Sequence, residues 1–180
     1  MTAITHQRAG LLSGLLTHQF FIVQFYHDTN LYSKIFMITL FCVSTTIGAL
    51  LPDIDMPDSQ IGVFFPFISK KIGKTFKHRT ITHSLFSLLF FFLLLTLAPR
   101  LDVGGDFYTI IILGLMVGHI SHILLDILTP QGICLFYPFG KKINLANLRT
   151  GAFGETLLNH TLLLITTIYF IYSIYLFLFQ

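Results

Sequence analysis

The chain has 180 residues, of which 54% are hydrophobic and 11% are charged, and its formal net charge is +3. A mean hydropathy of +0.78 with 20 phenylalanines lies outside the range of soluble domains and indicates membrane-spanning segments. The length suits one membrane-embedded domain covering residues 1–180. Cys42 and Cys134 lack the spacing of a metal-binding pair, so we expect free thiols and no disulfide framework.

Five apolar segments follow one another along the chain, at 8–26, 32–52, 82–99, 107–129 and 155–179. Each is near the ~20 residues that a spanning helix needs. The first contains His18, Gln19 and Gln24, so it either spans the membrane, lies at the interface or is buried in the bundle. The predicted fold class is therefore all-α, a polytopic transmembrane helical bundle of about five spans, or of four spans plus one interfacial helix.

Basic residues are concentrated in two of the connections between these segments. The first connection has Lys70, Lys71, Lys74, Lys77 and Arg79, and the second has Lys141, Lys142 and Arg149. The connection near residue 100 instead opposes Arg100 to Asp102 and Asp106. The positive-inside rule then puts both basic connections and the N-terminus in the cytoplasm, and the C-terminus outside.

Residues 64–77 alternate phenylalanines and isoleucines with lysines at helical spacing. This pattern predicts a short amphipathic helix in the cytoplasmic headgroup layer, where lysines would face anionic lipids. An ordinary solvated basic loop is the alternative.

One set of histidines and carboxylates falls at the segment ends that this orientation makes cytoplasmic, whereas His18 and His27 lie toward the opposite face. The set is His6, Asp53, Asp55, His83, His122, Asp126 and Glu155. Imidazole and carboxylate are the side chains that divalent metals take as ligands, and they are costly to hold at membrane depth. The sequence therefore predicts one metal site, with the ligands His6, Asp53, Asp55, His78, His83, His122 and Asp126.

The spacing of the polar residues supports this site. His119, His122 and Asp126 share one helix face, which Gly114 and Gly118 extend toward a closely packed neighbour. We expect His122 and Asp126 to bind metal; the alternative is a packing face whose histidines bond to backbone. Because prolines flank Asp53 and Asp55, we expect an extended turn that directs both carboxylates one way.

Two further residues are candidates for catalysis. Arg79 lies between His78 and His83 and would steady an anionic substrate or transition state, although it is also a typical positive-inside residue. Glu155 would act as a general base or a ligand beside the metal. The alternative for Glu155 is a first-turn acid that the helix dipole favours.

Three motifs carry a resemblance to a known family. They are Leu51-Pro52-Asp53-Ile54-Asp55, His78-Arg79-x-x-Thr82-His83-Ser84, and Gly118-x-x-Ser121-His122-x-x-x-Asp126-x-x-Thr129-Pro130-x-Gly132. Together they resemble the LexA-regulated, inner-membrane, metal-dependent hydrolase family of bacteria, and His6 and Gly151 to Glu155 match as well. The resemblance implies a multi-spanning helical protein with metal-dependent hydrolase activity. Met56 and His119 depart from the family pattern, so neither is expected to be a required ligand.

The sequence thus predicts a metal-dependent hydrolase of the bacterial inner membrane whose site faces the cytoplasm. A mixed His and carboxylate set suits Zn²⁺ best, with Mn²⁺ or Fe²⁺ as alternatives. The predicted reaction is the attack of metal-activated water on an ester or phosphoester of a lipid-like substrate, and the predicted partners are membrane lipids and not nucleic acid. The competing prediction is a non-enzymatic metal-binding or transporting membrane protein.

Overall fold

The computed structural model describes residues 1–23, 30–97 and 105–179, and these are almost entirely helical. The α-helices are α1 (Ala3–His18), α2 (Leu31–Gly48), α3 (Gln60–Phe64), α4 (Pro66–Thr75), α5 (Leu85–Leu97), α6 (Gly105–Ile127) and α7 (Phe153–Phe179). A π-helical turn, η1 (Gln19–Val23), extends α1, and two 3-10 helices, η2 (Leu51–Asp55) and η3 (Ile81–His83), follow α2 and precede α5. The described residues contain no strand, only an isolated antiparallel bridge between Ile133 and Ile143. The all-α prediction is confirmed.

Three of the described helices are long and apolar enough to cross a membrane. They are Leu31–Gly48, Phe107–Ile127 and Phe153–Tyr175. The helix α5 is apolar but shorter, with 13 residues described, and residues 98–104, which include Arg100 and Asp102, lie outside the described part. The helix α1 is not among the three; it packs against α2, α6 and α7, as expected if the first segment is buried in the bundle.

Small residues bring the central helices close together. A Cβ atom on Gly118 of α6 would overlap the carbonyl oxygen of Thr45 in α2, and one on Gly48 of α2 would overlap the backbone of Leu115 in α6. A Cβ atom on Gly114 would lie 2.6 Å from that of Ser44. The prediction that Gly114 and Gly118 allow close helix approach is therefore confirmed.

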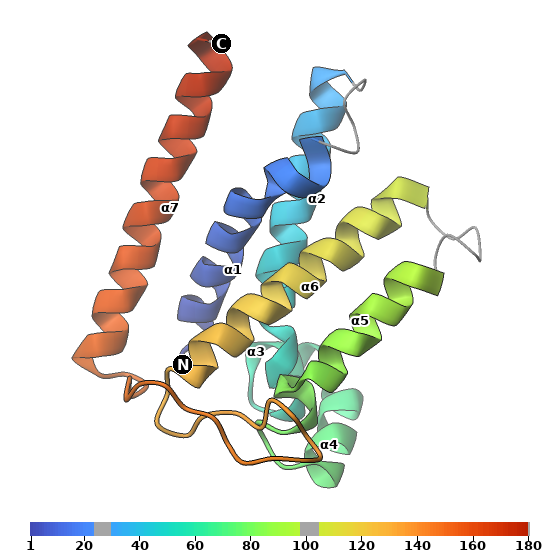
Figure 1. Cartoon of the computed structure of the whole chain (residues 1–180), viewed down its shortest axis with the longest axis vertical. Helices are drawn as coiled ribbons and strands as arrows, with labels where there is room; N and C mark the ends of the chain where they lie inside the picture. The colour runs from blue at the N-terminus through green and yellow to red at the C-terminus, as the bar shows by residue number, and fades with distance from the viewer. Residues whose placement is uncertain (24–29, 98–104, 180) are drawn as a thin grey trace.

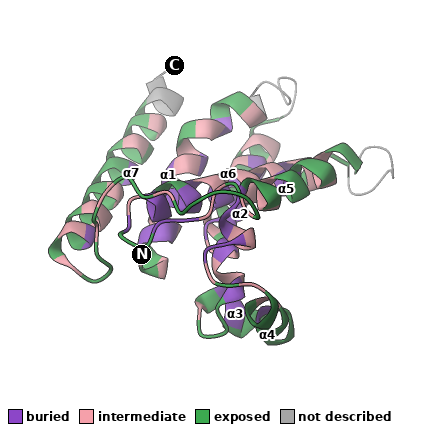
Figure 2. Cartoon of the chain, turned by 60° about the horizontal axis from the view of Figure 1, so that its bottom comes forward, coloured by how far each residue is buried: buried purple, intermediate pink, exposed green. Residues whose placement is uncertain are grey.

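The two ends of the bundle differ in what they hold. Figure 1 places the N-terminus, α3 and α4 at the lower end, and the C-terminus at the upper end. The buried residues gather where α1, α2 and α6 meet, whereas α7 packs on α1 and is exposed over most of its surface (Figure 2). In a bilayer the exposed apolar side chains of α7 would face lipid.

Below the spans, the helix predicted over residues 64–77 is found as α4, Pro66–Thr75, and a second short helix, α3, comes directly before it. The two helices are separated at Phe65, just before Pro66, because helical backbone angles are disfavoured for the residue before a proline. The lysines of α4 are exposed, and so are Phe64 and Phe67, at 80% and 89%. This surface has the amphipathic composition that was predicted, and its place in the headgroup layer stays a prediction.

Candidate metal centre

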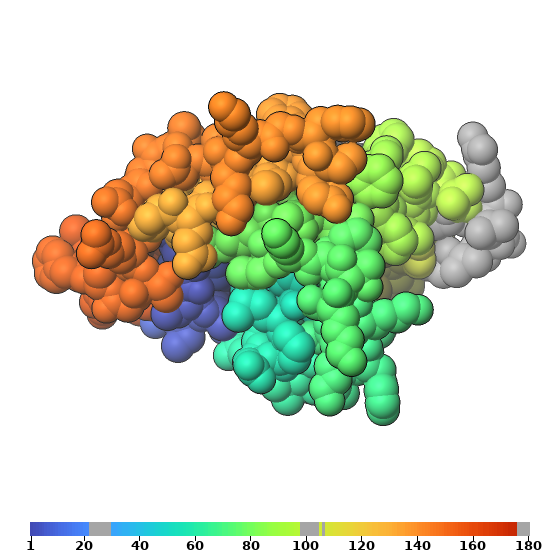
Figure 3. Space-filling view, turned by 90° about the horizontal axis from the view of Figure 1, so that it is seen from below, coloured from blue at the N-terminus to red at the C-terminus, as the bar shows by residue number. Residues whose placement is uncertain are grey.

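Five separate segments of the chain meet at the lower end of the bundle. They are the start of α1, the 3-10 helix η2, the loop before η3, η3 itself and the last turns of α6. Seen from below, the N-terminal residues, residues 50–80 and the segment after α6 lie side by side on one face (Figure 3). The predicted ligands, scattered over 120 positions of sequence, are thus brought into one cluster.

Four side chains form the centre of this cluster. The Nε2 atoms of His83 and His122 each lie 3.6 Å from Oδ1 of Asp53. Each also lies 3.6 Å from Oδ2 of Asp126. These separations are too long for hydrogen bonds. Two ligand atoms bound ~2.1 Å from one tetrahedral ion would be roughly 3.4 Å apart, so two histidines and two aspartates stand at the spacing of a shared ion.

The second oxygen of Asp126 faces the N-terminal segment. Its Oδ1 lies 3.5 Å from Nε2 of His6 and 3.2 Å from the α-amino group of Met1. The rings of His6 and His122 are stacked, with centroids 3.6 Å apart. His6, Asp53 and His122 can together present three ligand atoms within 4.8 Å of one another. The carboxylate of Asp126 therefore lies between two groups of ligands.

The histidine nitrogens that face this space lack hydrogen-bond partners. The Nε2 atoms of His6, His83 and His122 are buried and make no hydrogen bond. Nδ1 of His122 lies 2.7 Å from the carbonyl oxygen of Ala49, so it carries the proton and Nε2 presents its lone pair. An unpaired buried nitrogen costs about 1–3 kcal/mol, and a bound metal ion removes that cost. The donor set therefore fits a divalent metal.

The protonation of the cluster suits the same role. Burial lowers the pKa of His83, which favours the neutral imidazole that metals bind. Burial alone would raise the pKa of Asp53, but the adjacent His83 and His122 hold the pKa of that carboxyl below its usual range. Asp53 is thus a carboxylate beside two imidazoles.

Asp55 follows Asp53 by two residues, but its carboxylate has different contacts. Its oxygens accept hydrogen bonds from the Oγ1 of Thr82 at 2.9 Å and the backbone N–H of Arg79 at 3.3 Å. Nδ1 of His78 lies 2.9 Å from Oδ1 of Asp55. The segment is a 3-10 helix and not the extended turn that was predicted; Pro52 fits its first turn, where a missing N–H costs nothing. This backbone turns Asp53 toward the ligands and Asp55 toward the loop before η3.

Arg79 is buried within the site. Its Nη2 lies 3.0 Å from Oδ2 of Asp126, and its Nη1 donates to Oγ1 of Thr129 at 2.8 Å. The backbone of Arg79 is left-handed, with φ at 65°, a conformation that is uncommon outside glycine. The carboxylate of Asp55 and the N–H of Cys134 bond its backbone on either side and hold this conformation. Strain of this kind is concentrated at functional sites.

Glu155 is buried, but it belongs to none of the three groups of ligands among the described residues. One of its oxygens accepts from the backbone N–H of Thr2 at 2.5 Å and the Oγ1 of Thr5 at 3.1 Å. The other accepts from the backbone N–H of Gly151 at 2.6 Å. These bonds connect the start of α7 to the start of α1, which carries His6. The predicted role of Glu155 as base or ligand stays a prediction.

Two other histidines of the predicted region, His78 and His119, differ in their relation to the ligand groups. His78 is half-buried and can join Asp53 and His83 in a group of three ligand atoms. His119 lies outside all three groups; its Nε2 is 2.7 Å from Oγ of Ser87, in keeping with the expectation that it is not a required ligand. The contacts that Thr82, Thr129 and the amino group of Met1 make with the aspartates and Arg79 of the site were not predicted. Thr82 and Thr129 belong to the second and third sequence motifs described above, but the residue spacing in those motifs does not indicate which side chains they contact.

A polar cavity of about 500 Å³ opens beside the cluster. Its walls include Asp53, His78 and Arg79, together with Gln131 and Thr150 from the segment after α6. The volume lies within the range of small-molecule sites in proteins, about 300–1,000 Å³. A ligand in this cavity would meet the cluster at Asp53, whose side chain is 19% exposed while that of Asp126 is 1% exposed.

The chain is similar in sequence to known proteins. A protein-family model described as YdjM inner membrane protein matches residues 1–180. The uncharacterized protein YvsG of Bacillus subtilis (strain 168) is 39% identical over 133 residues, which cover 73% of this chain and 78% of that protein. The inner membrane proteins YdjM of Escherichia coli (strain K12) and Shigella flexneri are each 41% identical over 95 residues, or 53% of this chain and 47% of theirs. No solved structure matches.

Proposed function

We propose that this chain, which belongs to the YdjM inner membrane protein family, is a metal-dependent hydrolase of the inner membrane. The proposed substrate is an ester or phosphoester of a membrane-proximal, lipid-like molecule. One observation carries the proposal: three buried histidine Nε2 atoms without hydrogen bonds face two aspartates beside an open polar cavity. The family model and the two YdjM proteins are described as inner membrane proteins, and none of the matching descriptions names a reaction. The activity and LexA-dependent regulation therefore rest on the motif resemblance.

The residues present would hold a divalent ion. His83, His122, Asp53 and Asp126 form the best-spaced set, and His6 and His78 extend it on either side. Mixed nitrogen and carboxylate donors favour Zn²⁺, with Mn²⁺ or Fe²⁺ as alternatives. When bound, such an ion supplies Lewis-acid polarisation of the substrate and activation of water.

The other residues act on this centre. Arg79 carries a fixed positive charge in the wall of the polar cavity and would stabilise negative charge that develops on the ester or phosphoester. Asp55 orients Arg79 and His78 through its hydrogen bonds. The contacts of Glu155 favour a positioning role, in which it holds the start of α1 so that His6 reaches Asp126.

The arrangement favours an enzyme over a transporter. A transporter needs polar groups at mid-depth and on both sides of the membrane. All three groups of ligand atoms found among the described residues lie at the lower end, where the N-terminus and the two basic segments also are. We propose that this end faces the cytoplasm, on the charge asymmetry of the connections.

The test combines metal analysis with turnover. The purified wild-type protein should contain about one or two divalent ions per chain and should hydrolyse p-nitrophenyl esters or phosphates. Chelation should abolish turnover, and the metal that was bound should restore it. If the protein binds metal but hydrolyses neither class of substrate, the hydrolase proposal is refuted and the non-enzymatic, metal-binding alternative is kept.

A further inference from the structure

The polar cavity at the metal centre shares a wall with an apolar groove. The groove has a volume of about 790 Å³ and is lined by Ile47 at the end of α2 and by Val63, Phe64 and Phe65 of α3 and its C-terminal end. The residues common to both spaces are Leu50, Asp58, Gln60 and Ile61. One continuous lining thus leads from an apolar surface to Asp53 and Arg79.

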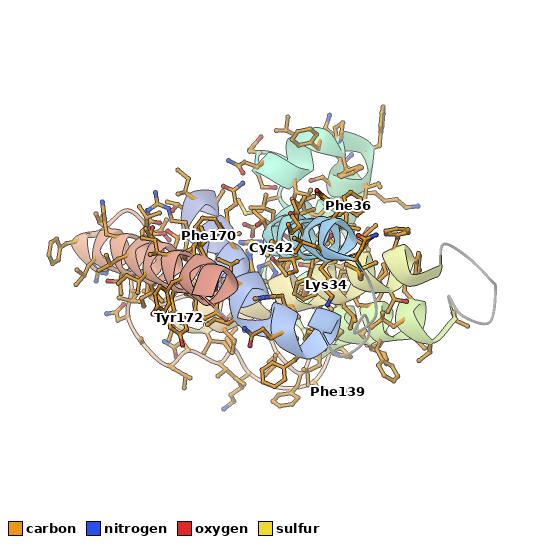
Figure 4. The ribbon with its side chains drawn as sticks, turned by 90° about the horizontal axis from the view of Figure 1, so that it is seen from above. Lys34, Phe36, Cys42, Phe139, Phe170 and Tyr172 are labelled. Carbon is orange, nitrogen blue, oxygen red and sulfur yellow. The ribbon has the colours of Figure 1, made fainter. Side chains whose placement is uncertain are left out.

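The other apolar hollows of the described residues lack this connection. One, of about 640 Å³, lies at mid-depth and is lined by α1, α2 and α7, with Cys42 and Phe170 in its walls (both labelled in Figure 4). Another, of about 400 Å³, lies against α5 and His119. Neither shares a lining residue with the polar cavity. Among these hollows of the described residues, the groove beside α3 is the one that shares lining residues with the polar cavity.

The position of this groove suits a molecule that enters from the membrane. Val63 and Phe64 are 66% and 80% exposed, although both are apolar. Exposed apolar side chains next to the ends of spanning helices would lie at the depth where acyl chains meet headgroups. Two polar side chains of the groove lining, Gln7 of α1 and Gln60 of α3, are joined by a hydrogen bond of 3.1 Å, and Gln60 also lines the polar cavity.

We propose that the groove and the cavity form one binding site for a single-chain amphiphile. The apolar chain of a membrane lipid would lie against α3 and the end of α2, and its ester or phosphoester head would lie in the polar cavity beside Asp53 and Arg79. This inference rests on the proposed function and adds to it the class and orientation of the substrate. Binding would then draw on both parts of the molecule, the phosphate head in the polar cavity and the chain against the apolar side chains of the groove.

Photolabelling in lipid nanodiscs tests this site without requiring turnover. The probe is dodecyl phosphate with a diazirine at the end of the chain, and its control is the same diazirine-bearing chain without phosphate. With metal-loaded wild-type protein, we expect the phosphate probe to label residues 61–65 at least about fivefold more than the control chain. Unlabelled dodecyl phosphate should suppress this excess, and inorganic phosphate at the same concentration should not, because it lacks the chain.

A matched pair of variants locates the chain. Phe64 and Phe67 are both exposed phenylalanines of the same surface, but only Phe64 lines the groove. Phe64→Ala should lower the head-dependent labelling roughly three- to tenfold, because the ring no longer contacts the chain. Phe67→Ala should leave it unchanged. Equal effects of the two variants would mean that they act through membrane attachment, and would overturn the inference.

The outcomes separate this inference from the proposed function. Labelling that is the same with and without phosphate, or that concentrates on α7, would overturn the site while leaving hydrolysis of soluble esters intact. Head-dependent labelling of residues 61–65 in a protein that hydrolyses nothing would support the site and refute the hydrolase.

Discussion

Replacing His122 with alanine, beside the same replacement of His119, separates metal binding from helix packing. Both histidines lie on α6 one turn apart, with 0% and 3% of their surface exposed. Each has one ring nitrogen 2.7 Å from an oxygen, of Ala49 for His122 and of Ser87 for His119. Only His122 belongs to the candidate ligand groups. The structural cost of the two changes is therefore matched.

The magnitude follows from the linkage between metal binding and stability. Metal at 100 times its Kd stabilises a protein by about 2.7 kcal/mol. For a chain of this length that is a rise in Tm of about 5–11 °C. Loss of a ligand that weakens binding 100-fold leaves about 0.4 kcal/mol at the same metal concentration, or a rise of about 1–2 °C.

Thermal unfolding of the purified variants, with and without metal, measures this difference. Without metal, His122→Ala and His119→Ala should unfold at similar temperatures, since each loses one buried hydrogen bond. With metal, His119→Ala should show the full rise in Tm and His122→Ala almost none, and the bound metal should follow the same order. A His122→Ala protein with the full metal-dependent rise would refute ligation and leave His122 as a packing residue.

Three further predictions concern the residues around the centre. If Glu155 is the general base, the Glu155→Gln variant should keep its full metal content and lose hydrolysis about 10²–10⁴-fold. If Glu155 instead positions α1, the variant should bind metal about 10–100-fold more weakly and regain turnover at saturating metal. The hydrogen bonds of Glu155 favour the second result. In the Arg79→Lys variant a single side-chain nitrogen replaces the two that contact Thr129 and Asp126. We expect kcat/KM to fall about 10–100-fold at unchanged metal content. An equal fall in metal content would show that Arg79 only holds Asp126 in place for the metal. A topology reporter placed at Asn144 should read cytoplasmic and one placed after α7 should read outside; the reverse reading would overturn the proposed orientation.

Much of this protein could be predicted from local pattern. Apolar runs of near-spanning length are sufficient to indicate membrane helices, because no soluble fold needs them, and α2, α6 and α7 were located to within a few residues. The failures fell where short-range backbone geometry decides the outcome. Residues 51–55 form a 3-10 helix and not an extended turn, and the helix predicted over residues 64–77 begins only at Pro66 and ends at Thr75.

The sequence by itself determined which residues stand at the helix ends, since carboxylates and imidazoles are costly at membrane depth. It did not determine which of them face one another. Asp53 and Asp55 are the same residue type two positions apart, yet only Asp53 belongs to the ligand groups, because the 3-10 helix and the close packing of α2 on α6 set their directions. The same packing places His122, 69 positions after Asp53, at 3.6 Å from it. A distance between residues so far apart in sequence depends on the whole helix arrangement, which no local pattern contains.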